Sequence, residues 1–476
     1  MMKKICSYVI GICTVAVLAL AAACSNDRYE DYVTVIPKDV KGVVAIRFDN
    51  IVNKTGVARS PLIRLAMSKM SEALSADMET KAKALLDDPA LSGIDFDCPA
   101  YAFAVNEQLF GLTVKIDDVS LFDELMGSLV KLDICSKVKK SGDYQWSSLA
   151  NGSVRIVYSD NTLLIVFSQA ETAKNLDRMM LAMMNMKADD SFVATPQFAK
   201  LREQKFEDLQ VYFNLGVDGY EQADILKEML PKGAKPADYE VVAGLNLREG
   251  GVDIQSLLFS TNEKAQAEFD NYFASLKPMK GEYINKIPRG TKVWACMGAD
   301  GEKLADMLKR VPKTKEALLA AGFVVDAEQM LRSIDGDLMV YVKPDKGEEE
   351  MGMYAQVGKC DFMKDMDSWM ESAEKYGYTI KMESTGSYQL KGEDVDLHWA
   401  IDGKQLYVGT ASYTPLTAQG QNKHADDMNG ALFYAFVDLS SEHVFANSVT
   451  VKSTKPGEII IKADIASFPE ILWKGL

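Results

Sequence analysis

Three histidines are the side chains of this sequence best suited to act as general bases or metal ligands: His398, His424 and His443. They are too scattered for the His-Glu-x-x-His pattern, in which one helix presents two imidazoles to a zinc ion. The sequence also contains no Gly-x-Ser-x-Gly nucleophile turn, no P-loop and no dinucleotide-binding glycine fingerprint. Because His398 lies in a stretch with strand-like alternation, we expect it to be partly buried and locally hydrogen-bonded. We therefore assign no catalytic or cofactor-binding residue from the sequence.

One acidic motif occurs twice, as Asp95-x-Asp97 and as Asp335-x-Asp337, each time ahead of a predicted strand. Carboxylates two residues apart can begin a calcium-binding loop, but no third acidic ligand follows at the next alternate position. We expect these aspartates to bond their own turns instead, and we assign no metal ligand. Two carboxylates about 5 Å apart across a cleft could also hydrolyse glycosides. Adjacent acidic residues are no more frequent here than the composition gives by chance, so they do not indicate such a site.

Methionines and tryptophans could supply an apolar binding surface. One predicted helix is rich in methionine: Met179, Met180, Met183, Met184 and Met186. The tryptophans, which could stack on sugar rings, are Trp146, Trp294, Trp369, Trp399 and Trp473. Methionine is also a common gap-filler in protein cores, so we expect core packing for the helix. Trp294 lies in an apolar strand pattern and Trp369 in an amphipathic helix, so at most one or two tryptophans should be exposed.

The composition is that of a folded protein with more than one domain. The chain has 476 residues, 47% hydrophobic and 25% charged, which excludes disorder for most of its length. Its formal net charge of −15 repels phosphate backbones, so nucleic acid is not an expected partner.

The first residues are typical of an exported lipoprotein. Lys3 and Lys4 precede the apolar stretch Ile5–Ala23, which ends in three alanines directly before Cys24. This pattern predicts a signal peptide over residues 1–23 and resembles a bacterial lipobox, so we predict lipidation of Cys24. Leu20 lies one position earlier than the usual leucine, and an uncleaved membrane anchor is the alternative. Residues 24–32 are predicted to form a polar tether to the outer membrane.

Four cysteines remain in the exported part: Cys98, Cys135, Cys296 and Cys360. An oxidising compartment would permit disulfides, but the spacings match no zinc motif and no small disulfide scaffold. We favour buried free thiols, with a Cys98–Cys135 pair as the alternative.

Several segments recur in the same order in the second half of the chain. Ile36-Pro37 recurs as Ile287-Pro288, and Gly111-Leu112 recurs as Gly352-Met353. Residues 94–97, 142–145 and 160–168 recur at 334–337, 386–389 and 402–410. The recurrence predicts a tandem duplication, with a first repeat at 33–277 and a second at 283–476. The first copy carries extra residues near 196–236.

Each copy alternates between strand and helix periods. Alternating residues predict hairpins at 101–116 and 154–167 in the first copy, and at 339–357 and 397–408 in the second. Amphipathic helices are predicted over 119–131 and 362–373. Strand pairs joined by turns and followed by helices predict antiparallel sheets with helices packed on one face, which is an α+β fold.

Several of these motifs together resemble a known family. They are Val35-Ile36-Pro37-Lys38-Asp39, residues 51–56, and Ser92-Gly93-Ile94-Asp95 leading to residues 99–103. The chain resembles an uncharacterised domain-of-unknown-function family of outer-membrane lipoproteins from Gram-negative gut anaerobes. The resemblance implies a location and a fold but no chemistry.

These observations favour a non-catalytic binding or scaffolding protein, tied to the outer membrane through Cys24 and facing the periplasm or the cell surface. Its partner would be an unknown protein or glycan. The alternatives are a hydrolase of envelope or dietary polysaccharide, with carboxylates from both halves, and an envelope chaperone that uses the methionine-rich helix.

Overall fold

The computed structural model describes residues 30–55, 80–81, 83–85, 88–149, 152–168, 173–216, 226–227, 230–231, 233–309, 325–345, 348–393, 395–440 and 446–465. The described residues form two compact units, one within 1–220 and 240–255 and the other within 221–239 and 256–476. The division falls inside strand β10 (Gly251–Phe259). Residues 256–277 therefore belong with the second unit, whereas the sequence placed them at the end of the first repeat.

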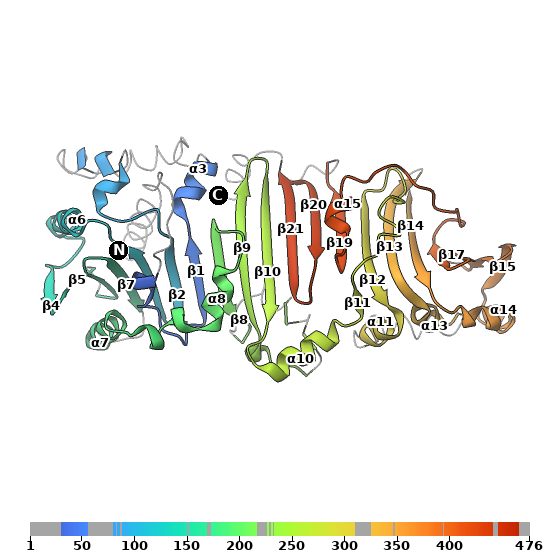
Figure 1. Cartoon of the computed structure of the whole chain (residues 1–476), viewed down its shortest axis with the longest axis horizontal. Helices are drawn as coiled ribbons and strands as arrows, with labels where there is room; N and C mark the ends of the chain where they lie inside the picture. The colour runs from blue at the N-terminus through green and yellow to red at the C-terminus, as the bar shows by residue number, and fades with distance from the viewer. Residues whose placement is uncertain are drawn as a thin grey trace. The chain divides into compact units, whose positions relative to one another are not determined.

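The first unit is built of antiparallel strands and short helices (Figure 1). Its strands are β1 (Gly42–Ile46), β2 (Ala100–Asn106), β3 (Leu109–Lys115), β4 (Lys139–Ser141), β5 (Tyr144–Ser148), β6 (Val154–Tyr158), β7 (Thr162–Ser168), β8 (Leu209–Asn214) and β9 (Glu240–Arg248). Its helices are α2 (Glu30–Val33), α3 (Phe48–Thr55), α6 (Val119–Lys131), α7 (Ala173–Met184) and α8 (Pro196–Arg202), with 3-10 turns η2 (Pro89–Ser92), η3 (Ala188–Asp190) and η4 (Phe192–Ala194).

The second unit has the same kinds of element. Its strands are β11 (Leu276–Lys277), β12 (Val293–Asp300), β13 (Ile334–Asp345), β14 (Glu348–Val357), β15 (Thr379–Ser384), β16 (Ser387–Lys391), β17 (Asp396–Asp402), β18 (Gln405–Gly409), β19 (Phe433–Asp438), β20 (Ala446–Ser453) and β21 (Glu458–Ile465). Its helices are α10 (Glu263–Tyr272), α11 (Gly301–Leu308), α13 (Ala327–Arg332), α14 (Met366–Lys375) and α15 (Ala425–Met428), with 3-10 turns η5 (Pro236–Asp238) and η6 (Asp361–Asp365).

Nine strands of each unit pair in the same order. In the first unit the order across the sheet is β4-β5-β6-β7-β3-β2-β1-β8-β9. In the second unit it is β15-β16-β17-β18-β14-β13-β12-β19-β20-β21. All of these pairings are antiparallel, and they confirm the four predicted hairpins. The chain is therefore a mixed α and β protein dominated by antiparallel sheet.

A glycine and an aromatic ring mark the same place in both sheets. Phe103 on β2 lies opposite Gly111 on β3, and Tyr341 on β13 lies opposite Gly352 on β14. A Cβ atom at either glycine would overlap the facing ring. Only glycine leaves room for the ring to lie across the neighbouring strand in this way.

Local sequence explains where the main helices begin. Asp118 accepts hydrogen bonds from the backbone of Ser120 and Leu121, so α6 begins at Val119 as predicted. The predicted helix at 362–373 differs at its start, because residues 361–365 form the 3-10 turn η6 and α14 begins only at Met366. The N-terminal end of the described chain packs on the first unit: Tyr32 is 1% exposed and its hydroxyl donates to the carbonyl of Pro99. Residues 30–32, which the sequence placed in the tether, therefore belong to the helix α2.

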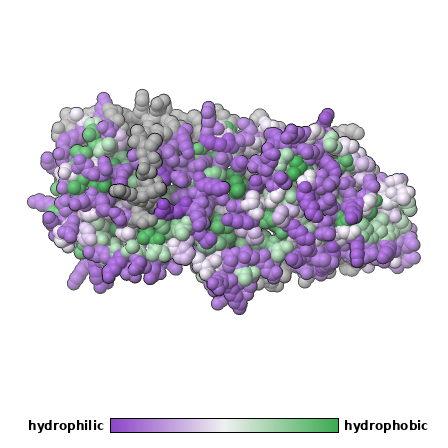
Figure 2. All heavy atoms as spheres, in the orientation of Figure 1, coloured by the Kyte–Doolittle hydropathy of each residue, from purple (hydrophilic) through white to green (hydrophobic). Residues whose placement is uncertain are grey.

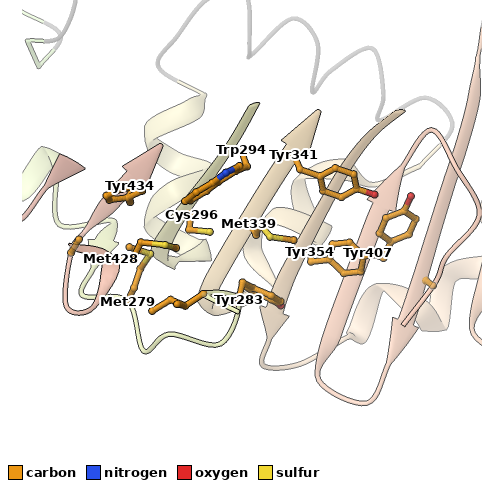
Figure 3. Close-up of a cluster of buried hydrophobic side chains, with 13 residues drawn as sticks. Met279, Tyr283, Trp294, Cys296, Met339, Tyr341, Tyr354, Tyr407, Met428 and Tyr434 are labelled. Carbon is orange, nitrogen blue, oxygen red and sulfur yellow. The ribbon is translucent and has the colours of Figure 1, made fainter. Parts of the chain in front are cut away.

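The core of the second unit is rich in aromatic rings and sulfur. Figure 3 shows Trp294 and Cys296 on β12, Met339 and Tyr341 on β13, and Tyr354 and Tyr407 on the strands beside them. On the face of the molecule drawn in Figure 2, hydrophilic residues cover most of the surface and leave smaller hydrophobic areas between them. Among the described residues, no helix is both long enough and apolar enough to cross a bilayer.

Candidate functional site

A pocket of about 220 Å³ opens at one edge of the aromatic core of the second unit. Three parts of the chain line it: the loop 284–287, the loop 419–424, and the side chains of Trp294 and Phe436. We call it the second-unit pocket. Its volume is below the roughly 300 Å³ at which sites for drug-sized ligands begin, so it suits one ring or one side chain.

Two paired strands supply the aromatic floor of this pocket. Trp294 on β12 lies directly opposite Phe436 on β19, with ring centroids 5.8 Å apart. Trp294 is 4% exposed and also stacks on Tyr434 at 5.5 Å. The ammonium group of Lys423 lies 5.4 Å from the centroid of Phe436. The floor is therefore held by the core and carries a cation at its rim.

Hydrogen bonds between two distant loops shape the polar rim. The backbone N–H of Gln419 donates to the carbonyl of Asn285 at 2.8 Å. The side chain of Asn285 accepts from the N–H of Asn422, and the side-chain amide of Asn422 donates to the carbonyl of Ile284, both at 2.8 Å. These bonds join segments more than 130 residues apart and fix the loop 419–424 above the aromatic floor.

His424 contributes one buried ring nitrogen to the pocket wall. Its Nδ1 lies 2.8 Å from the hydroxyl of Tyr434, whose pKa is raised by burial. The phenol therefore stays protonated and donates to Nδ1, which places the remaining imidazole proton on Nε2. Nε2 is buried without a hydrogen-bond partner among the described residues. Burial and the charge of Lys423 lower the pKa of His424, so the ring is neutral at pH 7.

The lining side chains can stack on a ligand and hydrogen-bond to it. The lining contains side-chain amides, a lysine, a histidine and apolar groups, but no carboxylate, hydroxyl or thiol side chain. Hydrolysis of a glycoside needs two carboxyl groups, and acyl transfer needs a nucleophile beside its base. A histidine bonded to a tyrosine has neither kind of partner.

The structure places His398 in a second cluster of polar groups. Its Nδ1 lies 3.1 Å from Glu383 and 3.5 Å from Ser412, and its Nε2 lies 3.3 Å from Asp396. Burial would raise the pKa of Glu383, but hydrogen bonds from His398 and Ser412 outweigh this and lower it. In a Ser-His-Asp triad the serine and the carboxylate face opposite ring nitrogens. Here Ser412 and Glu383 share one nitrogen and Asp396 lies at the other, so the three groups are not arranged as a Ser-His-Asp triad.

This arrangement confirms the sequence-based expectation for His398, which is 6% exposed and locally bonded. His443 lies outside the described residues. His424 gave no functional signal in the sequence, yet it lines the pocket.

The two acidic motifs have different structural roles. Asp95 accepts the N–H of Asp97 at 3.0 Å and pairs with Lys115 at 2.6 Å, so it bonds its own turn as predicted. Asp337 is 3% exposed and accepts the backbone N–H groups of Lys280 and Glu282 at 2.8 and 2.7 Å. It therefore fixes the loop ahead of the pocket and does not bond its own turn. No three His, Cys, Asp or Glu side chains of the described chain are grouped so as to hold a metal ion.

Most of the other candidate residues pack in the core. Met180, Met183 and Met184 on α7 are buried, as are Trp294, Trp369 and Trp399. Met179 and Met186 are partly buried, and so is Trp146, which lies under the ammonium group of Lys139 at 4.5 Å. Trp473 lies outside the described residues.

The thiols of Cys98, Cys135, Cys296 and Cys360 are free, as favoured over the Cys98–Cys135 pair. Cys135 and Cys296 are buried as predicted, whereas Cys98 and Cys360 are only partly buried. Burial raises the pKa of the Cys98 and Cys135 thiols to about 11. Neither thiol is therefore a reactive thiolate at neutral pH. Cys24, the predicted lipidation site, and the signal peptide lie outside the described residues.

Comparisons with known proteins give a family but no activity. Two solved structures align over most of this chain: crystal form I of TP0453, at 10% identity, with a TM-score of 0.24, over 81% of this chain and 93% of that one; and the DNA polymerase III beta subunit of Thermotoga maritima, at 12% identity, with a TM-score of 0.10, over 79% and 100%. TM-scores this low support no structural argument. No curated protein matches the chain significantly. Residues 32–413 match the family described as "Domain of unknown function (DUF4836)", and the chain belongs to that family.

Proposed function

We propose that this protein is a non-catalytic binding protein, anchored by lipid on Cys24 to the outer membrane, and that its ligand enters the second-unit pocket. The observation that carries the proposal is the make-up of that pocket: an aromatic floor, an amide-rich rim and no carboxylate. Such a lining can hold a ligand by stacking and hydrogen bonds, and it lacks the groups that would break a bond in it.

The other proposed activities find less support in the described residues. A hydrolase needs two carboxylates facing one space, and the carboxylates near His398 are bonded to that ring and to neighbouring side chains. A chaperone that uses the methionine-rich helix needs those side chains at the surface, whereas three of the five are buried. A binding or scaffolding role needs neither a pair of facing carboxylates nor exposed methionines.

The proposed anchor rests on the N-terminal pattern of Lys3, Lys4, an apolar stretch and three alanines before Cys24. The negative net charge would keep the body of the protein off an anionic lipid surface, so the acyl chains would carry the attachment. Producing cells can be labelled with palmitate, with and without globomycin. We expect label on the wild type and none on Cys24→Ala, and a labelled Cys24→Ala protein would contradict the anchor.

We also propose that the two units arose by tandem duplication. The matching order of strand pairing supports this, as does the recurrence of a glycine under an aromatic ring at Gly111 and Gly352. Ile94 bridges Ile116 just as Ile334 pairs with Val357, so the sequence recurrence agrees with the strand register. On this proposal, the two units inherited the same strand pairing and differ in the segments that pack on their sheets.

Binding can be tested by crosslinking the native lipoprotein in intact cells and identifying what is captured. Phe436→Ala removes half of the aromatic floor, and Phe433→Ala is the matched control because it lies on the same strand with its side chain on the opposite face. We expect Phe436→Ala to lose the captured partner and Phe433→Ala to keep it. Equal capture by both variants would place binding elsewhere.

A further inference from the structure

The first unit fills the corresponding place with one of its own side chains. Val43 on β1 lies opposite Tyr212 on β8, just as Trp294 on β12 lies opposite Phe436 on β19. Phe192 packs on Tyr212 with ring centroids 5.3 Å apart, and Phe192 is 1% exposed. In the second unit no phenyl ring corresponds to Phe192: the imidazole of His424 packs on Phe436, with ring centroids 4.9 Å apart, and the pocket lies beside these two rings.

The backbone around Phe192 shows how this ring is held. The N–H of Phe192 donates to the carbonyl of Ile36 at 2.8 Å, and Ser191 forms a β-bridge with Pro37. Ile36-Pro37 corresponds to Ile287-Pro288 in the recurrence, at the same distance ahead of β12 as of β1. Ser191, which lies between the 3-10 turns η3 and η4, therefore crosses this loop in an extended conformation.

The second unit leaves the equivalent backbone position open. Its loop bonds Asn285, two residues before Ile287, through the N–H of Gln419. No donor from the described part of the chain reaches the carbonyl of Ile287, which lines the pocket. An extended peptide crossing at Ile287 could therefore donate an N–H there, as Phe192 does to Ile36.

The two units also differ in the pairing of a basic residue near this position. In the first unit Lys38 lies 4.0 Å from Asp190, the residue two positions before Phe192. Arg289 takes the place of Lys38 in the recurrence, is exposed, and makes no ion pair with any described residue. A carboxylate two residues before an aromatic ring would lie within reach of it.

We propose that the second-unit pocket binds an extended peptide segment through an aromatic side chain, with an acidic residue two positions earlier. The aromatic ring stacks on Phe436 and Trp294, its N–H donates to the carbonyl of Ile287, and the acid pairs with Arg289. The exposed amides of the rim, from Gln419 and Gln421, bond the peptide backbone. This inference rests on the proposed function and names the class of its partner as a protein.

The chain supplies its own probe. A fluorescein-labelled peptide with the sequence of residues 187–195 contains Asp190 and Phe192, and its binding to the full-length lipoprotein in detergent can be followed by fluorescence anisotropy. We expect saturable binding that weakens at least about tenfold when Phe192→Ala is introduced in the peptide, because an anchor ring carries most of the affinity of such a contact. Equal binding of the two peptides would overturn the proposal.

Variants of the protein locate the site. We expect Phe436→Ala to weaken binding about tenfold and Phe433→Ala to leave it unchanged, with both variants folded by circular dichroism. Arg289→Gln, or Asp190→Asn in the peptide, should weaken binding about two- to threefold, and less at high salt, because the pair is exposed. Binding that survives Phe436→Ala would mean that the peptide binds elsewhere and would also overturn the proposal.

A sugar ring is the competing occupant of a pocket of this size, and the test separates the two. If methyl glycosides bind with dependence on Phe436 and the peptide does not, the peptide proposal fails while the proposed binding function stands. If neither binds and Phe436→Ala still captures the native partner in cells, the proposed function fails as well.

Discussion

The two units share the order of their strands and differ in the segment that leads back to the centre of the sheet. In the first unit this segment, residues 169–208, contains α7 and α8 and places Phe192 on Tyr212. In the second unit the corresponding segment, residues 410–432, is shorter, and α15 is its one helix. It leaves a pocket beside Phe436. The two units therefore share their strand pairing, and the connecting segment determines whether the sheet carries a buried phenyl ring or a pocket at this position.

The strongest test of this comparison is the loss of the ring itself. Phe192→Ala should destabilise the protein by about 3–5 kcal/mol, because it empties a fully buried site. Phe436→Ala should cost about 1–2 kcal/mol, because that ring already faces an open pocket and loses less burial. Urea unfolding followed by circular dichroism measures both. Equal losses would show that the second site is as closed as the first.

The paired glycines test whether the two sheets are equivalent. Gly111→Ala and Gly352→Ala each drive a methyl group into the ring of Phe103 or Tyr341. We expect each to cost about 1–3 kcal/mol, since overpacking forces the ring off its rotamer. The measurement is the shift of the urea midpoint for each variant. A large loss at one glycine and none at the other would break the equivalence.

Acid should affect the second unit through His424. Burial lowers the pKa of this histidine below that of the unfolded chain, so the unfolded state binds its proton first as the pH falls. Stability is therefore lost as the pH falls through about 6.5, the ordinary pKa of histidine, toward the folded value. Wild type and His424→Gln can be compared at pH 7.5 and pH 5. We expect a smaller acid loss in His424→Gln, and an unchanged loss would mean that the ring is not protected from protonation.

The smallest effect should come from Lys38. Its partner Asp190 lies 4.0 Å away and both side chains are more than half exposed. Lys38→Gln should change stability by less than about 0.5 kcal/mol, since exposed ion pairs contribute little. A larger loss in urea unfolding would mean that this contact, rather than the Phe192 ring, holds the segment in place.

Local patterns in the sequence predicted much of this fold. Alternation predicted the hairpin of β2 and β3, where Asn106 accepts the N–H groups of Gln108 and Leu109 to close the turn. Periodicity predicted α6 at its observed bounds, where the apolar face of the helix packs on the sheet and Asp118 caps the first turn. The recurrence of Gly111 as Gly352 agrees with the register of the strands, which places both opposite a ring.

The candidate site could not be predicted in the same way. The pocket depends on hydrogen bonds between Asn285 and Asn422, residues that no local pattern connects. His398 likewise meets Glu383 and Ser412 from different parts of the chain. One signal was present in the sequence: the first half carries extra residues near 196–236, a stretch that begins with α8.

A crystal structure of the full-length protein with the peptide of residues 187–195 would test the central claim most directly. The account predicts the peptide phenyl ring on Phe436 and Trp294, with its N–H bonded to the carbonyl of Ile287. A peptide ring bound away from Phe436, with the pocket empty or occupied by a sugar, would contradict it.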